Sequence, residues 1–111
     1  MKRGEIFFAD LNPARGSEIT KHRPVLIVSN NANNQVAKIL TVLPITSNVT
    51  RVYPFEVLIT AINSGLSKDS KVQAQQIRTI DKERITGNVV GRLDQKIMDK
   101  VNDAIRLHLS I

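Results

Sequence analysis

The feature that most constrains the fold is a series of short apolar runs, each closed by residues that favour turns. The runs are rich in β-branched side chains, which pack well on a pleated sheet. They stop at Asn, Pro, Ser or Gly, which are the usual turn formers. The pattern predicts strands over residues 6–9, 24–28, 39–43, 55–59, 71–77 and 85–90. Loops or turns are expected over residues 14–22, 29–34, 45–54 and 64–66.

The C-terminal segment has a different period. Asp94 can cap the first free backbone N–H groups of a helix. The apolar residues that follow share one face at helical spacing; they are Ile97, Met98, Val101, Ile105 and Leu109. This stripe predicts a helix of about 16 residues, roughly 24 Å long. Short strands followed by one amphipathic helix indicate a mostly β fold, a small barrel or sandwich packed by a terminal helix. We expect one domain over residues 1–111.

Composition argues against several classes of protein. The chain has no cysteine and two histidines, and its carboxylates are scattered, so we expect no metal and no cofactor. No apolar run approaches the roughly 18 residues of a membrane span. The first residues, Met1 to Glu5, lead directly into a predicted strand and do not resemble a signal peptide. These features predict a cytoplasmic protein without a membrane partner.

The net charge is +6 and is uneven along the chain. Residues 1–80 hold ten Lys and Arg against five Asp and Glu, whereas residues 81–111 hold six against five. A basic surface attracts phosphate backbones and acidic partners. The same charge would also simply keep a small protein in solution, so composition favours nucleic-acid binding without deciding it.

Two polar clusters stand at expected junctions of strand and loop. The first comprises Ser17, Glu18, His22 and Arg23, and the second comprises Thr46 and Ser47. An arginine at the mouth of a rigid strand can meet a phosphate with two hydrogen bonds. A nearby hydroxyl can donate to a phosphoryl oxygen or orient a ribose hydroxyl. The alternative is that Arg23 is only solvated or ion-paired and that Thr46 and Ser47 only cap a turn.

Several short segments, in order along nearly the whole chain, resemble the MazF/PemK toxin family. They are Arg3-Gly4-Glu5-Ile6, Asp10-Leu11-Asn12-Pro13, Gly16-Ser17-Glu18, Arg23-Pro24-Val25-Leu26-Ile27, Pro44-Ile45-Thr46-Ser47, Tyr53-Pro54-Phe55-Glu56-Val57 and Gln76-Ile77-Arg78-Thr79-Ile80-Asp81. The resemblance implies a small SH3-like barrel of the PemK/CcdB toxin type with a C-terminal helix. It also implies the toxin of a type II toxin–antitoxin system, a homodimer that cuts single-stranded RNA at specific sequences without a metal. In that reaction the ribose 2′-OH attacks the adjacent phosphorus and leaves a 2′,3′-cyclic phosphate and a 5′-OH.

The resemblance also implies roles for particular residues. Arg23 would stabilise charge on the phosphorane and is a candidate proton donor, but its guanidinium stays protonated and is a poor base. Thr46 would bind the phosphate or orient the attacking hydroxyl, and Glu18 would position or accept a proton. The expected RNA-binding residues are Ser17, His22, Ser47, Arg51, Gln76 and Arg78.

One departure from the family pattern bears on the chemistry. Some relatives carry an arginine and an aspartate just before the Gln-x-Arg-Thr-Ile-Asp segment and use them as acid and base. The corresponding residues here are Gln73 and Gln75, neither of which titrates. This places more weight on Glu18, His22 and Arg23, and leaves the general base open.

Two other functions remain compatible with the sequence. A non-catalytic nucleic-acid-binding barrel would need aromatic side chains on which bases can stack. Only Phe7, Phe8, Phe55 and Tyr53 are present. A toxin directed at gyrase can share the same fold, since fold alone does not fix function. As a toxin, the chain should be inhibited by an antitoxin whose acidic, disordered segment folds across the basic groove.

Overall fold

The computed structural model describes residues 1–12, 15–17 and 21–111. In this part of the chain the strands are β1 (Glu5–Asp10), β2 (His22–Ile27), β3 (Ile39–Thr46), β4 (Glu56–Ile59), β5 (Ser70–Gln73), β6 (Arg78–Asp81) and β7 (Ile85–Arg92). The helices are α1 (Asn31–Val36), α2 (Ala61–Ser64) and α3 (Gln95–Leu109), with 3-10 turns at Ala74–Gln76 and Lys82–Arg84. The fold is therefore mostly β with a C-terminal helix, as the sequence predicts.

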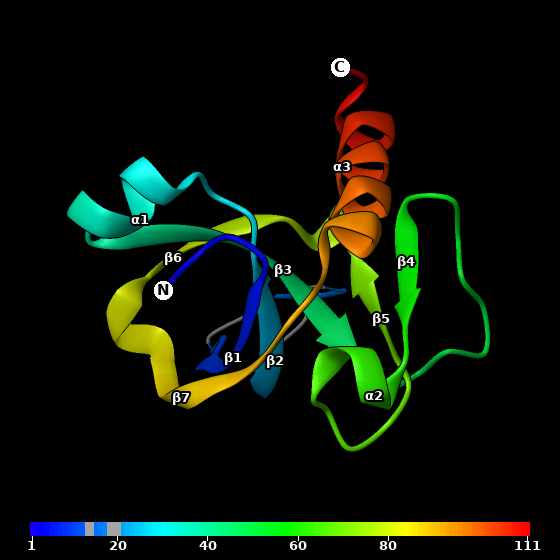
Figure 1. The fold of residues 1–111 in the computed structure, drawn as a ribbon, viewed down its shortest axis with the longest axis horizontal. Helices are drawn as coiled ribbons and strands as arrows, with labels where there is room; N and C mark the ends of the chain where they lie inside the picture. The colour runs from blue at the N-terminus through cyan, green and yellow to red at the C-terminus, as the bar shows by residue number, and fades with distance from the viewer. Residues whose placement is uncertain (13–14, 18–20) are drawn as a thin grey trace.

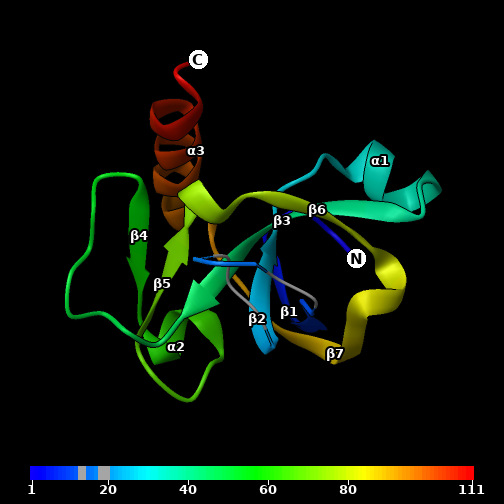
Figure 2. The same ribbon diagram turned by 180° about the vertical axis from the view of Figure 1, so that it is seen from behind.

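The strands form a strongly bent antiparallel sheet in the order β4-β5-β3-β2-β1-β7, and β6 pairs with β3 beside this path. Figure 1 shows α3 standing beside β4 and β5, while α1 and β6 lie at the other side of the molecule. Figure 2 shows the same arrangement from behind, with β3 running between the two regions. The long β3 strand thus belongs to both halves of the sheet, because it pairs with β2 and β6 and also with β5.

The central strands β1, β2 and β3 bury apolar side chains on both faces. We call one the α3 face, because Leu26 and Leu43 there share a core with Met98 and Val101 of α3. The opposite face belongs to a second core, made by Phe7, Ala9, Leu11, Val25, Ile27, Leu40, Val42 and Ile80. Alternate residues of each strand therefore point into two different cores, as the period of two in a strand requires.

The terminal helix follows the prediction closely. Asp94 accepts a hydrogen bond from the Ile97 N–H at 2.9 Å, and the helix spans 15 residues. Met98 and Val101 are buried, and Ile97 and Ile105 pack partly against the same core. Leu109, predicted to belong to the buried stripe, is 44% exposed because the last turn extends beyond the sheet (Figure 1).

One segment predicted as a turn, and the residues just before another, form short helices. The Asn-rich segment forms α1, because the Asn30 side chain accepts from the Asn33 N–H at 2.8 Å and caps it. The segment before Gly65 forms α2, which Thr60 caps. Gly65 then adopts a left-handed conformation with φ of 78°, which favours glycine.

Other predicted boundaries also change. The predicted strand over 71–77 is strand only over Ser70–Gln73, is buried rather than partly exposed, and continues as a 3-10 turn. The predicted loops over 45–54 and 14–22 are each shorter, because β3 continues to Thr46 and β2 already begins at His22. No helix in the described residues is long and apolar enough to cross a membrane.

Candidate functional site

Two of the three residues expected to carry catalysis, Arg23 and Thr46, lie at the same end of the β2–β3 pair. The antiparallel register pairs Ile27 with Val42, Leu26 with Leu43 and Val25 with Pro44. The ladder ends at Val25 and Pro44, and Arg23 and Thr46 each lie two residues beyond it, at the same end of the two strands. Opposite residues of an antiparallel pair project from the same face. The Arg23 and Thr46 side chains are both half-buried. By the alternation of side chains along each strand, both lie on the face away from α3, which also carries Val25 and Val42 of the second core.

The neighbours of these two residues in the sequence belong to the α3 face instead. His22 stacks on Phe8 at 5.2 Å between ring centroids, and its Nε2 is 2.6 Å from the Thr86 hydroxyl. His22 and Ser47 line a cavity of about 270 Å³, to whose wall Arg23 also contributes. The other residues of this wall are Phe8, Pro24, Ile45, Leu66, Ser67, Lys68 and Ser70. The predicted clusters therefore meet at one end of β2 and β3, but they divide between two faces.

The Thr46 hydroxyl already has one partner. It accepts a hydrogen bond from the Asn48 N–H at 3.3 Å, so it does cap the turn that follows β3. A hydroxyl that accepts once still has a hydrogen to donate and a second lone pair. The structural role and the predicted chemical role of Thr46 are therefore compatible.

Arg78 shares the face of Arg23 and Thr46, since it pairs with Val42 on that face. Its Nη1 donates to the Leu11 carbonyl at 3.3 Å. Gln76 Nε2 donates to the Ser17 carbonyl at 3.3 Å. These two bonds bring the segment after β1 against the segment around β6. Glu18, the predicted proton acceptor, lies outside the described residues.

A charged cluster that the sequence analysis missed continues the same row. Thr46 pairs with Lys71 of β5, so Lys71 flanks Thr46 on the side away from Arg23. The Lys71 side chain is 10% exposed, and its Nζ donates to Glu56 Oε1 at 3.0 Å and to the Arg51 carbonyl at 2.6 Å. Glu56 pairs with Gln73 on the neighbouring row. The ion pair is thus built into the sheet beside the predicted site.

The Glu56 carboxylate receives hydrogen bonds from four groups. The Tyr53 N–H and Lys71 donate to Oε1, whereas Gln73 Nε2 and Gln75 Nε2 donate to Oε2 at 3.3 and 2.7 Å. Burial by itself raises the pKa of Glu56, but the hydrogen bonds together outweigh it and lower the pKa below 4.5. Glu56 is therefore an anion across the neutral range. Gln73 and Gln75 act here as neutral donors to this carboxylate.

Arg51 is exposed and lies against Tyr53. Its Nη1 donates to the Tyr53 hydroxyl at 3.1 Å, and its Cζ lies 5.7 Å from the ring centroid. Tyr53 stacks on Phe55 with 5.4 Å between centroids and 7° between planes, yet stays 41% exposed. The predicted RNA-binding residue is therefore part of an ordered aromatic group. Among the described residues, no three His, Asp or Glu side chains gather as a metal site would require.

A signal for the missed cluster was present in the sequence. Glu56 is a charged residue inside an otherwise apolar strand segment, where an unpaired charge would be costly. A buried partner for it was therefore to be expected, whereas Lys71 lies in a mostly polar segment and gave no such signal. The strand order could not be known without the fold.

Comparison with known proteins identifies the family. The model of the family described as PemK-like, MazF-like toxin of type II toxin-antitoxin system matches residues 2–109. The chain belongs to this family.

Full-length relatives agree with this assignment. The endoribonuclease MazF9 of Mycobacterium tuberculosis is 44% identical over 100% of this chain and 98% of its own length. The endoribonuclease EndoA of Bacillus subtilis is 39% identical over 100% of this chain and 96% of its own length. A mycobacterial endoribonuclease solved in complex with its cognate antitoxin superposes with a TM-score of 0.81 at 27% identity, covering 100% of this chain and 96% of that one. MazF from Deinococcus radiodurans, at 23% identity, shares the fold with a TM-score of 0.86, covering 100% and 97%.

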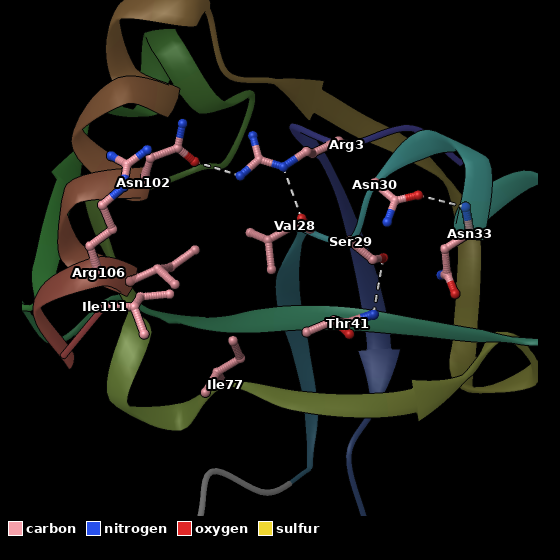
Figure 3. Close-up of a pocket in the computed structure, with 11 residues that line it drawn as sticks. Arg3, Val28, Ser29, Asn30, Asn33, Thr41, Ile77, Asn102, Arg106 and Ile111 are labelled. Carbon is pink, nitrogen blue, oxygen red and sulfur yellow. Dashed lines mark hydrogen bonds between the residues drawn. The ribbon is translucent and has the colours of Figure 1, made fainter. Parts of the chain in front are cut away.

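A larger cavity in this family member lies away from Thr46, between α3 and the β2–β3 region (Figure 3). Its volume is about 520 Å³, and Val28, Ile77, Ile105 and Ile111 supply apolar wall. Arg3 bridges it, donating from Nε to the Val28 carbonyl at 2.8 Å and from Nη2 to Asn102. This cavity contains none of the residues predicted to act on RNA.

Proposed function

We propose that this MazF-like toxin is a metal-independent, sequence-specific endoribonuclease that cleaves single-stranded RNA by attack of a ribose 2′-OH on the adjacent phosphorus. The placement of Arg23 and Thr46 at the same end of the paired strands β2 and β3 carries the proposal. Both residues belong to strands of the sheet rather than to a loop. The naming of relatives that are 37–44% identical as endoribonucleases supports the same activity.

The chemistry needs three things, and the described residues supply two of them. Negative charge builds on the phosphoryl oxygens as the phosphorane forms, and the Arg23 guanidinium can neutralise it with two hydrogen bonds. The Thr46 hydroxyl can donate to a phosphoryl oxygen or orient the 2′-OH. Arg23 is also the proposed donor of a proton to the leaving 5′-oxygen.

Removal of the 2′-OH proton is assigned to Glu18. Gln73 and Gln75 do not titrate, and the four hydrogen bonds of Glu56 make that carboxylate a weak base. Glu18 is the carboxylate nearest to Ser17 in the sequence, and Gln76 binds the Ser17 carbonyl. Ser17, Ser47, His22, Gln76, Arg78 and Arg51 are proposed to hold the RNA strand around the scissile phosphate.

The test uses purified protein, excess EDTA and a long single-stranded RNA. We expect discrete fragments that carry 5′-OH and 2′,3′-cyclic phosphate ends. A second substrate, identical except for one 2′-deoxy nucleotide on the 5′ side of a mapped cut, should resist cleavage at that position alone. Cleavage that persists at the deoxy position, or that requires an added divalent ion, would contradict the proposed reaction.

We further propose that the protein is a homodimer in a cytoplasmic toxin–antitoxin system and is inhibited by an acidic antitoxin segment. Leu107, Leu109 and Ile111 are exposed apolar residues at the end of the chain, in the last turn of α3 and just after it, and a second copy of this chain would cover them. Light scattering should give about twice 12.4 kDa. Leu107→Glu should yield a monomer, whereas Val36→Glu, at an exposed apolar residue of α1, should leave the mass unchanged.

A further inference from the structure

The segment between β3 and β4 is held at two backbone points by the buried pair of Lys71 and Glu56. Lys71 Nζ donates to the Arg51 carbonyl at 2.6 Å, and the Tyr53 N–H donates to Glu56 Oε1 at 2.9 Å. The pair itself is joined at 3.0 Å, with side chains only 10% and 1% exposed. One ion pair therefore fixes the residues on both sides of Val52 against β4 and β5.

The side chains held in this way are suited to a nucleobase. Tyr53 presents an aromatic ring that is 41% exposed, and Phe55 supports the ring by stacking nearly parallel to it. Arg51 lies over the same ring as an exposed planar cation. Single-stranded nucleic acids are bound by stacking of bases on aromatic rings and guanidinium planes, with cations on the phosphates.

The position of the group relative to the proposed reaction follows from the sheet. Lys71 is the cross-strand partner of Thr46. Neighbouring strands are about 4.8 Å apart. The Arg51–Tyr53 group is therefore held by the residue that flanks Thr46 in the sheet.

Two buried hydrogen-bond acceptors lie beside the ion pair of Glu56 and Lys71. The Oε1 atoms of Gln73 and Gln75 are buried and have no hydrogen-bond partner, while the Nε2 atoms of both residues donate to Glu56. Both amides are therefore oriented by the Glu56 carboxylate. The oriented amides tie the carboxylate to β5 and keep the ion pair in one geometry.

We propose that Arg51 and Tyr53 form a base-stacking subsite for the nucleotide next to the cleaved phosphate, with Lys71 and Glu56 as its positioning residues. The inference rests on the proposed function, since it names the surface that selects the RNA sequence. Loss of the subsite should raise KM and relax the cleavage sequence. It should leave kcat on a saturating substrate nearly unchanged, because the reacting phosphate is held by other residues.

The chain offers a specific probe, because Tyr53 is its only tyrosine and it has no tryptophan. The intrinsic fluorescence of the protein therefore reports this ring alone. The ligand for the test is a 2′-O-methyl oligoribonucleotide that spans a mapped cleavage site and has no 2′-OH to react. We expect it to quench the Tyr53 emission in a saturable way at low salt.

Four variants separate the alternatives. Binding by the variants is measured from the fluorescence anisotropy of a fluorescein label on the oligonucleotide, because Tyr53→Leu has no tyrosine emission. Tyr53→Leu and Arg51→Ala change exposed side chains and should each weaken binding of the oligonucleotide, Tyr53→Leu by roughly ten-fold. Lys71→Met should weaken binding as much as Tyr53→Leu does. Lys96→Met, which removes an exposed lysine of α3, is the matched control for the lost charge and should bind as the wild type does.

The outcomes are distinct. The subsite would be overturned if wild-type protein cleaved RNA but showed no quenching by the oligonucleotide. It would also be overturned if Tyr53→Leu and Arg51→Ala kept the wild-type KM and cleavage sequence. Either result would leave the proposed function intact. A Lys71→Met variant that melts earlier but keeps wild-type KM would overturn its positioning role. Saturable quenching by a protein that cleaves no RNA would support the subsite and refute the endoribonuclease.

Discussion

The two faces of the β2–β3 pair are alike in their middle and different at their end. Each face buries an apolar row, Leu26 and Leu43 toward α3 and Val25 and Val42 toward the second core. At the strand end, the α3 face carries His22 and Ser47, whereas the opposite face carries Arg23 and Thr46. Residues that are neighbours in the sequence therefore serve different surfaces, and the comparison predicts that only one surface performs the chemistry.

The largest expected effect separates Arg23 from His22. Arg23→Ala should lower the rate of RNA cleavage by about 100- to 1000-fold, because it removes the charge that stabilises the phosphorane. His22→Ala removes only a proposed contact with bound RNA, so it should raise KM and leave kcat within about two-fold of wild type. Both variants are measured as kcat at saturating RNA, with circular dichroism to verify folding. Equal losses in both variants would mean that the two faces form one site.

The next prediction concerns stability. The face that carries Thr46 continues onto β5 with Lys71 and its buried partner Glu56, and the contribution of this pair to the free energy of unfolding can be measured. Glu56→Gln should lower the free energy of unfolding at pH 7 by about 3 kcal/mol, since it leaves the Lys71 charge buried without its partner. The Glu56 pKa is lowered in the folded protein, so its contribution is present above pH 4.5 and is lost as the pH falls through the folded value. The difference between wild type and variant, measured by urea unfolding, should therefore shrink in acid.

Glu83→Gln provides the control for this measurement, since Glu83 is exposed. Its effect should stay within about 0.5 kcal/mol at either pH. A constant difference between Glu56→Gln and wild type down to pH 3 would contradict the assignment of the effect to the ionised carboxylate.

The smallest expected effect on cleavage distinguishes the hydroxyl of Thr46 from that of Ser47. Thr46→Val keeps the β-branched shape that suits a strand and removes the hydroxyl, so we expect kcat to fall by about ten-fold. Ser47→Ala should leave kcat within about two-fold of wild type. Single-turnover cleavage at saturating protein measures both. A larger loss in Ser47→Ala than in Thr46→Val would reverse the assignment of faces.

The sequence predicted the main elements because the patterns that specify them are local. The cap at Asp94 and the stripe through Met98 and Val101 determine α3 without reference to the rest of the chain. The segment of α1 was predicted as a turn, and α2 was missed before the turn predicted over 64–66, because asparagine, serine and glycine signal a turn and a helix cap equally well. In each case a side-chain cap, from Asn30 or Thr60, decided between the two.

The candidate site was less accessible to sequence reasoning, because strand order and register join distant segments. Arg23 and Thr46 were chosen for their chemistry and family pattern, but their placement on one face follows from the pairing of Val25 with Pro44. His22 was grouped with Arg23 because the two are adjacent, whereas the pleat separates them. Gln73 and Gln75 were judged only by their inability to titrate, and their shared partner Glu56 lies more than 15 residues earlier.

The register of β2 and β3 also limits how genes of this family can change length. Residues 28–38, which include α1, join the two strands without setting which side chains face each other. Codons can be inserted or deleted there while Val25 stays paired with Pro44. A single codon gained within β3 would reverse the side of every residue beyond it and send Thr46 toward α3. Natural variation in length should therefore concentrate in the connection and be rare inside the strands.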